Sequence, residues 1–173
     1  DRGLRAQIRV KAKIMPDRAY YDSLPKKRMG AGCLFFNADG EVLLLKPSYK
    51  PTWEIVGGIV ENDESPKSAC EREITEEIGL DIHVERLLVV DYNDYPDDPD
   101  KTESLMFIFD GGVLSAEAIS QIRVCEGEIL GYQFFAPDKL PDALQTALAE
   151  RIRMAIHQRG MSGAVYLENQ KWR

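Results

Sequence analysis

The stretch of this sequence that most constrains its fold is 65–80, which carries a complete set of helix boundaries. Ser65 can cap the first turn, and Pro66 suits the first helical position. Gly79 can adopt the left-handed conformation that commonly ends a helix. The pattern therefore predicts a helix over residues 66–78, with a buried stripe at spacings of four residues that consists of Cys70, Ile74 and Ile78.

Three glutamates crowd one side of this helix, beside the apolar stripe. Glu73, Glu76 and Glu77 are three and four residues apart, so their carboxylates share a face. Like charges at these spacings destabilise a helix by roughly 0.2–0.5 kcal/mol per pair. Hard cations such as Mg2+ and Mn2+ take carboxylate oxygens, and a bound cation would turn the repulsion into a binding site. A solvated helix surface is the alternative interpretation.

The residues around the glutamates fit a cation site for a phosphate-containing substrate. Gly57 and Gly58 allow close approach of the backbone, so a carbonyl oxygen there can reach a metal ion. Arg72 is expected on a different side of the helix from the glutamates, where it can pair with Glu64 of the preceding loop. A metal ion in this place can polarise a phosphoryl oxygen and acidify a water molecule.

The spacing of these residues resembles the signature of the Nudix hydrolases. Over residues 58–80 the signature is matched in full by Gly58, Glu64, Arg72-Glu73-Ile74, Glu76-Glu77 and Gly79-Leu80. Background composition produces such a match on the order of once per billion start positions. One difference is Val56, which stands before the double glycine where many relatives have proline. It touches no metal ligand and affects only the expected shape of the loop.

The resemblance implies an enzyme that uses Mg2+ or Mn2+ and water to cleave a diphosphate in a nucleoside diphosphate linked to another moiety. It implies that Glu73, Glu76, Glu77 and the carbonyl of Gly57 bind metal, and that Gly58, Glu64 and Arg72 are structural supports. Many relatives use one more glutamate from a later loop, for which Glu126 and Glu128 are the candidates. We expect Glu126, because Glu128 can already lie in the next strand. The expected catalytic residues are then Glu73, Glu76, Glu77 and Glu126.

Two other functions stay open at this point. The signature holds only the diphosphate and its metals, so an isoprenoid or sugar diphosphate is an alternative substrate, and the fold cannot decide between them. The chain could also be a catalytically silent ligand sensor with the same fold. The presence of all three metal-binding glutamates argues against the sensor.

The rest of the chain mixes strand and helix patterns, which predicts a single α/β (α+β) domain. The resemblance implies a Nudix-type α/β/α sandwich with a central mixed β-sheet and a catalytic loop-helix-loop. We divide the sequence into an N-terminal arm or edge segment (1–27), the Nudix hydrolase domain (28–160) and a C-terminal tail (161–173) that can add an edge strand. The expected elements are a strand or arm at 4–15, a helical turn at 17–24, a hairpin over 30–46, strands over 54–60, 83–92, 105–114 and 126–137, and an amphipathic helix over 140–159.

Several residues outside the signature are candidates for substrate contact. Arg28, Lys46 and Trp53, with Tyr49 beside them, could contact a base or a phosphate, although packing or solvation is the more common role of such residues. The acidic stretch 91–103 is interpreted as a solvated loop, with a lid as the alternative. The apolar stripe of the last helix is interpreted as core, with a homodimer face as the second choice.

Composition and charge limit the partners. The net charge of −7 argues against binding of a nucleic-acid polymer, but it leaves a small diphosphate substrate, such as a nucleotide, held through a metal ion. No apolar run approaches the length of a membrane span, and no signal-peptide pattern is visible. The three cysteines lack zinc-site spacing and read as reduced thiols. We therefore expect a cytoplasmic protein that does not bind membranes.

Overall fold

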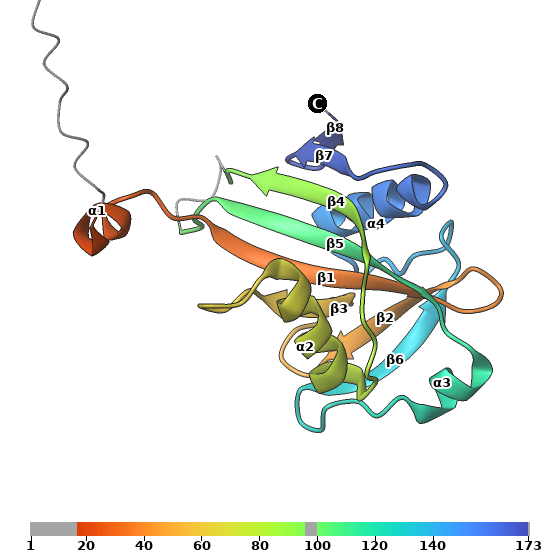
Figure 1. Ribbon diagram of the computed structural model, residues 1–173. Coiled ribbons are helices and arrows are strands. Elements are labelled where there is room, and N and C mark those ends of the chain that lie inside the picture. Colours follow the sequence, from red (N-terminus) through yellow and green to blue (C-terminus); the bar gives the residue numbers. More distant parts are fainter. Residues whose placement is uncertain (1–16, 96–99, 173) are drawn as a thin grey trace, which may run out of the picture.

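The computed structural model describes residues 17–95 and 100–172 (Figure 1). The described residues form a mixed sheet in the order β6-β2-β1-β5-β4-β7-β8, and β3 also pairs with β1. Its strands are β1 (Arg28–Phe36), β2 (Val42–Pro47), β3 (Val56–Ile59), β4 (Arg86–Asn93), β5 (Ser104–Val113), β6 (Ile129–Phe135), β7 (Val165–Glu168) and β8 (Lys171–Trp172). The helices are α1 (Arg18–Asp22), α2 (Pro66–Ile78), α3 (Ala116–Gln121) and α4 (Thr146–Arg159).

Strand β1 is the centre of the sheet. It pairs in parallel with β5 along its length, while its other edge pairs antiparallel with β3 over residues 30–33 and with β2 only at Phe36. Residues 30–36 are buried, which matches the nearly continuous apolar run expected of a strand covered on both faces.

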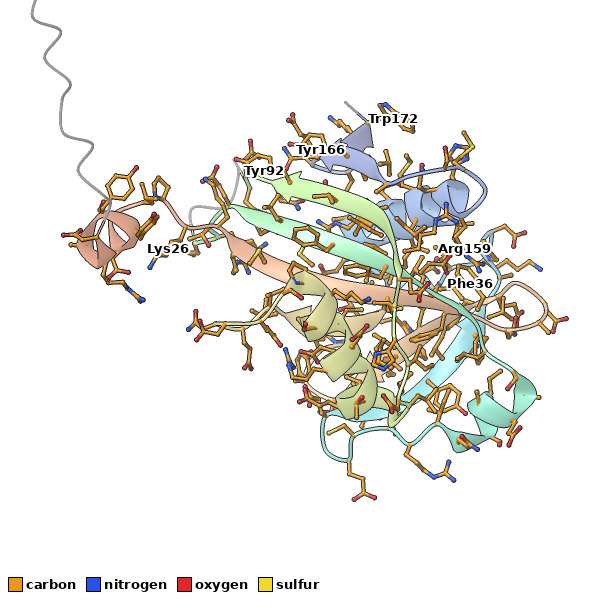
Figure 2. The ribbon with its side chains drawn as sticks, viewed as in Figure 1. Lys26, Phe36, Tyr92, Arg159, Tyr166 and Trp172 are labelled. Atoms are coloured by element: carbon orange, nitrogen blue, oxygen red, sulfur yellow. The ribbon has the colours of Figure 1, made fainter. Side chains whose placement is uncertain are left out.

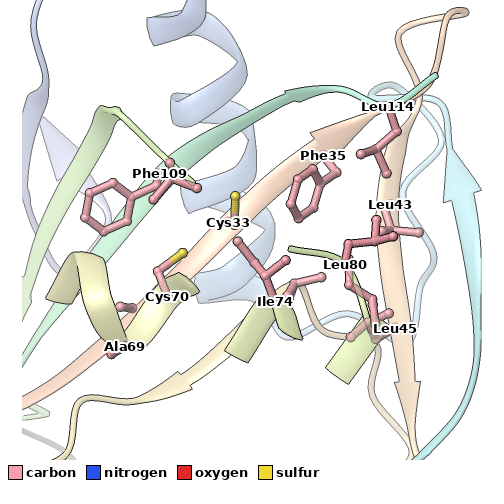
Figure 3. Close-up of a cluster of buried hydrophobic side chains, with 14 of the residues drawn as sticks. Cys33, Phe35, Leu43, Leu45, Ala69, Cys70, Ile74, Leu80, Phe109 and Leu114 are labelled. Carbon is pink, nitrogen blue, oxygen red and sulfur yellow. The ribbon is translucent and has the colours of Figure 1, made fainter. Parts of the chain in front are cut away.

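Helices α2 and α4 cover opposite faces of the sheet (Figure 1). On the α2 side, Cys33, Phe35 and Leu43 pack against Cys70 and Ile74 (Figure 3). On the α4 side, alternate residues of the same strands pack against the helix: Leu34, Phe36, Val42 and Leu44 share a cluster with Ile152 and Ala155. The expected sandwich with a central mixed sheet is confirmed.

The end of the chain extends the sheet. Strand β7 pairs in parallel with β4, and β8 pairs antiparallel with β7, so the predicted edge strand is confirmed. Tyr166 and Trp172 are exposed on these two strands (Figure 2). At the end of α4, the Arg159 guanidinium lies 3.9 Å from the centre of the Phe36 ring and 3.1 Å from the Asp110 carboxylate. This stacked arginine ties the end of α4 to β1 and β5.

Three predicted elements differ from the structure in extent. The strands of the predicted hairpin share one residue pair, because β2 pairs mainly with β6. Helix α4 begins at Thr146 and not at 140, because residues 142–143 form a turn in which the Ala143 carbonyl accepts a hydrogen bond from the Trp53 N–H, and Leu144 forms an isolated bridge with Trp53. Helix α3 was not predicted, although Ser115 caps it by accepting a hydrogen bond from the Ala118 N–H.

The interpretation of 91–103 as a solvated loop is wrong at its start. Strand β4 continues to Asn93, and both Asp91 and Asn93 are fully buried.

The apolar stripe of α4 packs on the sheet, which confirms its interpretation as core. The predicted turn at 17–24 is confirmed as α1, whereas the strand or arm expected at 4–15 lies outside the described residues. Among the described residues, none of the helices has the length and apolar character needed to cross a membrane.

Candidate active site

Helix α2 has the predicted bounds, and local signals set them. The Ser65 hydroxyl accepts a hydrogen bond from the Ser68 N–H at 3.1 Å, and Gly79 takes the left-handed conformation with φ 69°. Cys70, Ile74 and Ile78 are fully buried against the sheet. This packing fixes the rotation of α2 and therefore the direction in which the three glutamates face.

The Glu77 carboxylate is buried next to the double glycine. It is 8% exposed and accepts a hydrogen bond from the Gly57 N–H at 2.7 Å. Burial raises the pKa of Glu77 to about 8, the Gly57 N–H opposes this shift, and the nearby carboxylates of Glu73, Glu54 and Glu128 add to it. Glu77 is therefore an acid whose ionised form lacks a cationic partner among the described side chains.

Glu73 lies against the second glycine. A Cβ atom at position 58 would overlap the Glu73 carboxylate, and one at position 57 would overlap the carbonyl oxygen of Ala31. Gly57 also has a φ of 147°, which side chains rarely allow. Burial raises the pKa of Glu73, although Arg72 acts in the opposite direction. The double glycine is thus what lets β3 pass between β1 and the glutamates.

Arg72 connects the helix to the loop before it and to the glutamates. Its guanidinium donates two hydrogen bonds to Glu64, at 2.8 and 3.2 Å, and one to the carbonyl of Ile59 at 3.2 Å. The predicted pairing with Glu64 is therefore confirmed. The expectation that Arg72 lies on a different side from the glutamates is wrong, because its Nη1 also donates to Glu73 at 2.8 Å and to Glu76 at 2.9 Å.

The carboxylate and carbonyl oxygens around α2 are suitable ligands for a divalent cation. Within 17–95 and 100–172, no three acidic, histidine or cysteine side chains converge closely enough to hold a metal ion. Instead, the carboxylates of Glu73 and Glu76 both accept hydrogen bonds from the Arg72 Nη1, and the Glu77 carboxylate accepts one from the Gly57 N–H. One cationic atom already lies between two carboxylates, which shows that both can face the same positive charge. Carboxylate and carbonyl oxygens are the ligands that Mg2+ and Mn2+ prefer.

Of the two candidate glutamates in the later loop, Glu128 is the one whose charge acts on Glu73 and Glu77. Both side chains are exposed, and both residues lie in the turn that precedes β6 at Ile129. The Glu128 carboxylate is among the charges that raise the pKa of Glu73 and Glu77, whereas Glu126 is not. Two hydrogen bonds from Ser48 hold this turn, one to the Glu128 carbonyl at 2.8 Å and one to the Gly127 carbonyl at 2.6 Å. Glu128 stops short of the strand, so the reason for preferring Glu126 does not apply.

A cavity of about 380 Å³ opens on the other side of the double glycine. Its wall combines residues of β1, β3, β5, the start of α4 and the loops after β2 and β4: Arg28, Ala31, Gly32, Tyr49, Lys50, Glu54, Ile55, Gly57, Gly58, Ile59, Tyr95, Met106, Ile108, Gln145, Leu148 and Arg151. Gly57 and Gly58 therefore contact both the cavity and the glutamates of α2.

Two of the expected substrate contacts, Arg28 and Tyr49, line the cavity, and two others do not. Trp53 packs edge-on against Phe135, with ring centres 5.0 Å apart, and the Lys46 ammonium lies 5.4 Å from the centre of the Trp53 ring. Glu54, Tyr95, Gln145 and Arg151 also line the cavity and were not predicted from the sequence. No local signal marks them, because they meet only through pairing of distant strands.

Known proteins that resemble this chain include hydrolases of the family whose signature the site contains. The NUDIX domain model matches residues 26–156, and the chain therefore belongs to the Nudix family. A diphosphoinositol polyphosphate phosphohydrolase 3-alpha from Mus musculus is 37% identical over 82 residues, which are 47% of this chain and 50% of that protein. A MutT-like protein from Streptomyces ambofaciens is 39% identical over 49 residues, 28% of this chain and 32% of that protein. The chain thus matches half or less of the length of these relatives.

Among solved structures, a UDP-X diphosphatase resembles the chain with a TM-score of 0.66 and 26% sequence identity. The similarity covers 84% of this chain and 68% of that structure. The similarity therefore extends well beyond the signature at residues 58–80.

Proposed function

We propose that this protein is a metal-dependent pyrophosphohydrolase that cleaves the diphosphate linkage of a nucleoside diphosphate linked to another moiety. The observation that carries the proposal is the shared wall at Gly57 and Gly58. One side of this short backbone contacts Glu73 and Glu77, and the other side lines a cavity large enough for part of a small molecule. A diphosphate at this wall would lie next to the carboxylates while its attached group occupies the cavity.

The proposed ligands of Mg2+ or Mn2+ are the carboxylates of Glu73, Glu76 and Glu77 and the carbonyl oxygen of Gly57. We propose Glu128 in place of Glu126 as the additional glutamate, because its charge acts on Glu73 and Glu77. When bound, the metal supplies charge neutralisation at the phosphoryl oxygens and a more acidic water molecule. Glu73 and Glu76 can turn toward it by exchanging their hydrogen bonds with Arg72.

The remaining residues of the signature hold the catalytic groups in place. Arg72 keeps two hydrogen bonds to Glu64 and one to Ile59, so it can fasten the loop to α2 even without Glu73 and Glu76. The Gly57 N–H orients the Glu77 carboxylate. Among the glutamates of the site, Glu77 is the one most shielded from water, which suits a group that must hold or accept a proton beside the substrate.

The charges of the cavity favour a nucleotide substrate over an inositol ring that carries several phosphates. Of its three cationic lining residues, Lys50 is paired with Glu54, and Arg151 is paired with Asp91 at 2.6 Å. In the described part of the chain, this leaves Arg28 as the lining cation without a carboxylate partner. A ring with several phosphates would need several free cations, whereas Tyr49 and Tyr95 offer flat surfaces for a base.

We also propose a cytoplasmic location, which the three free thiols support.

The test is hydrolysis of a substrate panel with Mg2+ and with Mn2+. The panel contains nucleoside triphosphates, ADP-ribose, nucleotide sugars, dinucleoside polyphosphates and isoprenyl diphosphates. We expect turnover of one nucleotide class that stops in EDTA and falls at least about a hundredfold in Glu77→Gln. Glu85→Gln, at an exposed position after α2, is the matched control and should keep full activity. Full activity in Glu77→Gln would refute the proposed role of this carboxylate.

A further inference from the structure

A buried polar network connects the end of the chain to the cavity. The Arg151 Nε donates to Asp91 at 2.6 Å, and its Nη2 donates to Asn93 at 2.9 Å. Asp91 and Asn93 are fully buried, and Arg151 is 8% exposed. A buried arginine is costly unless it is paired and hydrogen-bonded, and these contacts meet that requirement on one edge of the guanidinium.

The other edge of Arg151 faces a different environment. Its Nη1 donates no hydrogen bond within the described part of the chain, and the residue lines the cavity. Nη1 and the second N–H of Nη2 therefore form a planar pair of donors that only a cavity occupant or water can satisfy. Because Asp91 balances the charge, this edge offers two hydrogen bonds and little net attraction for an anion.

Gln170 fixes the orientation of that edge. Its backbone N–H and its side-chain amide both donate to Asp91 at 3.0 Å, on the two different carboxylate oxygens. Asn169 and Gln170 have φ values of 50° and 61°, which non-glycine residues adopt only where surrounding contacts hold them. The turn between β7 and β8 thus holds the Asp91 carboxylate, which in turn holds Arg151.

We infer that Arg151 determines substrate specificity by reading a flat group with two adjacent hydrogen-bond acceptors, and that Gln170 positions it. The oxygen and ring nitrogen on the edge of a guanine base are such a pair, and arginine recognises that edge with two hydrogen bonds in other settings. Adenine presents an amino group in place of the oxygen and would oppose a donor to a donor. The inference rests on the proposed function, since it assigns the cavity to the base of the substrate.

The test is calorimetric binding of GMP and AMP without metal, with ribose 5-phosphate as the probe that lacks a base. Neither monophosphate contains a diphosphate, so the result does not depend on turnover. We expect GMP to bind about tenfold more tightly than AMP, and ribose 5-phosphate to bind more weakly than either. In Arg151→Lys, which keeps a positive charge beside Asp91, the preference should disappear. Arg153→Lys, at an exposed residue of the same helix, should keep it.

Gln170→Ala provides the second variant, for the case that Arg151→Lys does not fold. It removes the amide that holds Asp91 and should reduce the preference for GMP while binding of ribose 5-phosphate stays unchanged. Equal binding of GMP and AMP by the wild-type protein, or no binding of either at millimolar concentration, would overturn the inference. Binding of ribose 5-phosphate as tight as GMP would also overturn it, because Arg151 would then hold a phosphate. Failure of the proposed function has a different signature, the absence of metal-dependent hydrolysis across the panel.

Discussion

Two charged clusters lie on opposite sides of the sheet, and they differ in the balance between positive and negative charges. On α2, a single guanidinium, that of Arg72, faces Glu64, Glu73 and Glu76, while Glu77 is buried beside them without a cation. At α4, one guanidinium faces one carboxylate, and the amides of Asn93 and Gln170 add hydrogen bonds to this pair. The balanced cluster can stabilise the fold as it stands, whereas the excess negative charge on α2 is useful mainly when a cation binds.

The largest expected effect is on stability and comes from the balanced cluster. Asp91→Ala leaves the buried Arg151 guanidinium without its carboxylate, and we expect the free energy of unfolding to fall by about 3–5 kcal/mol. Urea denaturation followed by circular dichroism measures this change. Glu150→Ala breaks an exposed ion pair with Arg153 on the same helix and should cost at most about 1 kcal/mol. Equal losses in the two variants would show that burial does not distinguish these pairs.

The second expected effect is on activity and comes from the unbalanced cluster. Glu73→Gln removes a proposed metal ligand, and we expect kcat to fall about a hundredfold with Mg2+. The melting temperature should stay the same or rise, because the burial of the Glu73 carboxylate and the nearby charge of Glu76 together outweigh its contact with Arg72, as the raised pKa of Glu73 indicates. Steady-state kinetics and a thermal melt of the same preparation provide both values. A variant that loses stability and activity together would mean that Glu73 is needed for the fold.

A third expected effect is a pH dependence of the metal-free protein. The folded protein keeps the Glu77 proton up to about pH 8, while the unfolded chain releases it near the ordinary value of 4.5. Between these pH values the folded state binds more protons, so the contribution of Glu77 to stability is complete below about pH 4.5 and is lost as the pH rises to about 8. Melting curves in EDTA from about pH 5 to about pH 8 should show a decline that is smaller in Glu77→Gln. The same slope in both proteins would assign the decline to other groups.

The parts of the site that were predicted from the sequence depend on local signals. The bounds of α2 follow from Ser65, Pro66 and Gly79, and the pairing of Arg72 with Glu64 follows from their place around one loop. The parts that were missed depend on long-range pairing. Asp91 and Arg151 are 60 residues apart, and Asp91 stands at the start of an acidic run that has the composition of a surface loop. Only the pairing of β4 with β5 and β7 reveals that it is buried.

Strand pairing also decided which residues contact the cavity. Lys46 and Trp53 stand close to the signature in sequence, but the packing of Trp53 on Phe135 directs it into the core. Arg28 lies thirty residues before Gly58, yet the antiparallel pairing of β1 with β3 places both on the cavity wall. Proximity along the chain was therefore a weaker guide than position in the sheet.

The backbone of Gly57 and Gly58 forms a wall between the glutamates of α2 and the cavity, and different parts of the chain surround its two faces. The carboxylates are held by α2, the loop before it and the double glycine of β3, whereas the chemical character of the cavity comes from β1, β5, α4 and the loops after β2 and β4. Substitutions such as a change at Gln145 or Tyr95 can alter what fits without moving a carboxylate. A lineage of such proteins could therefore exchange one substrate for another by small steps, each of which leaves the bond-breaking machinery intact.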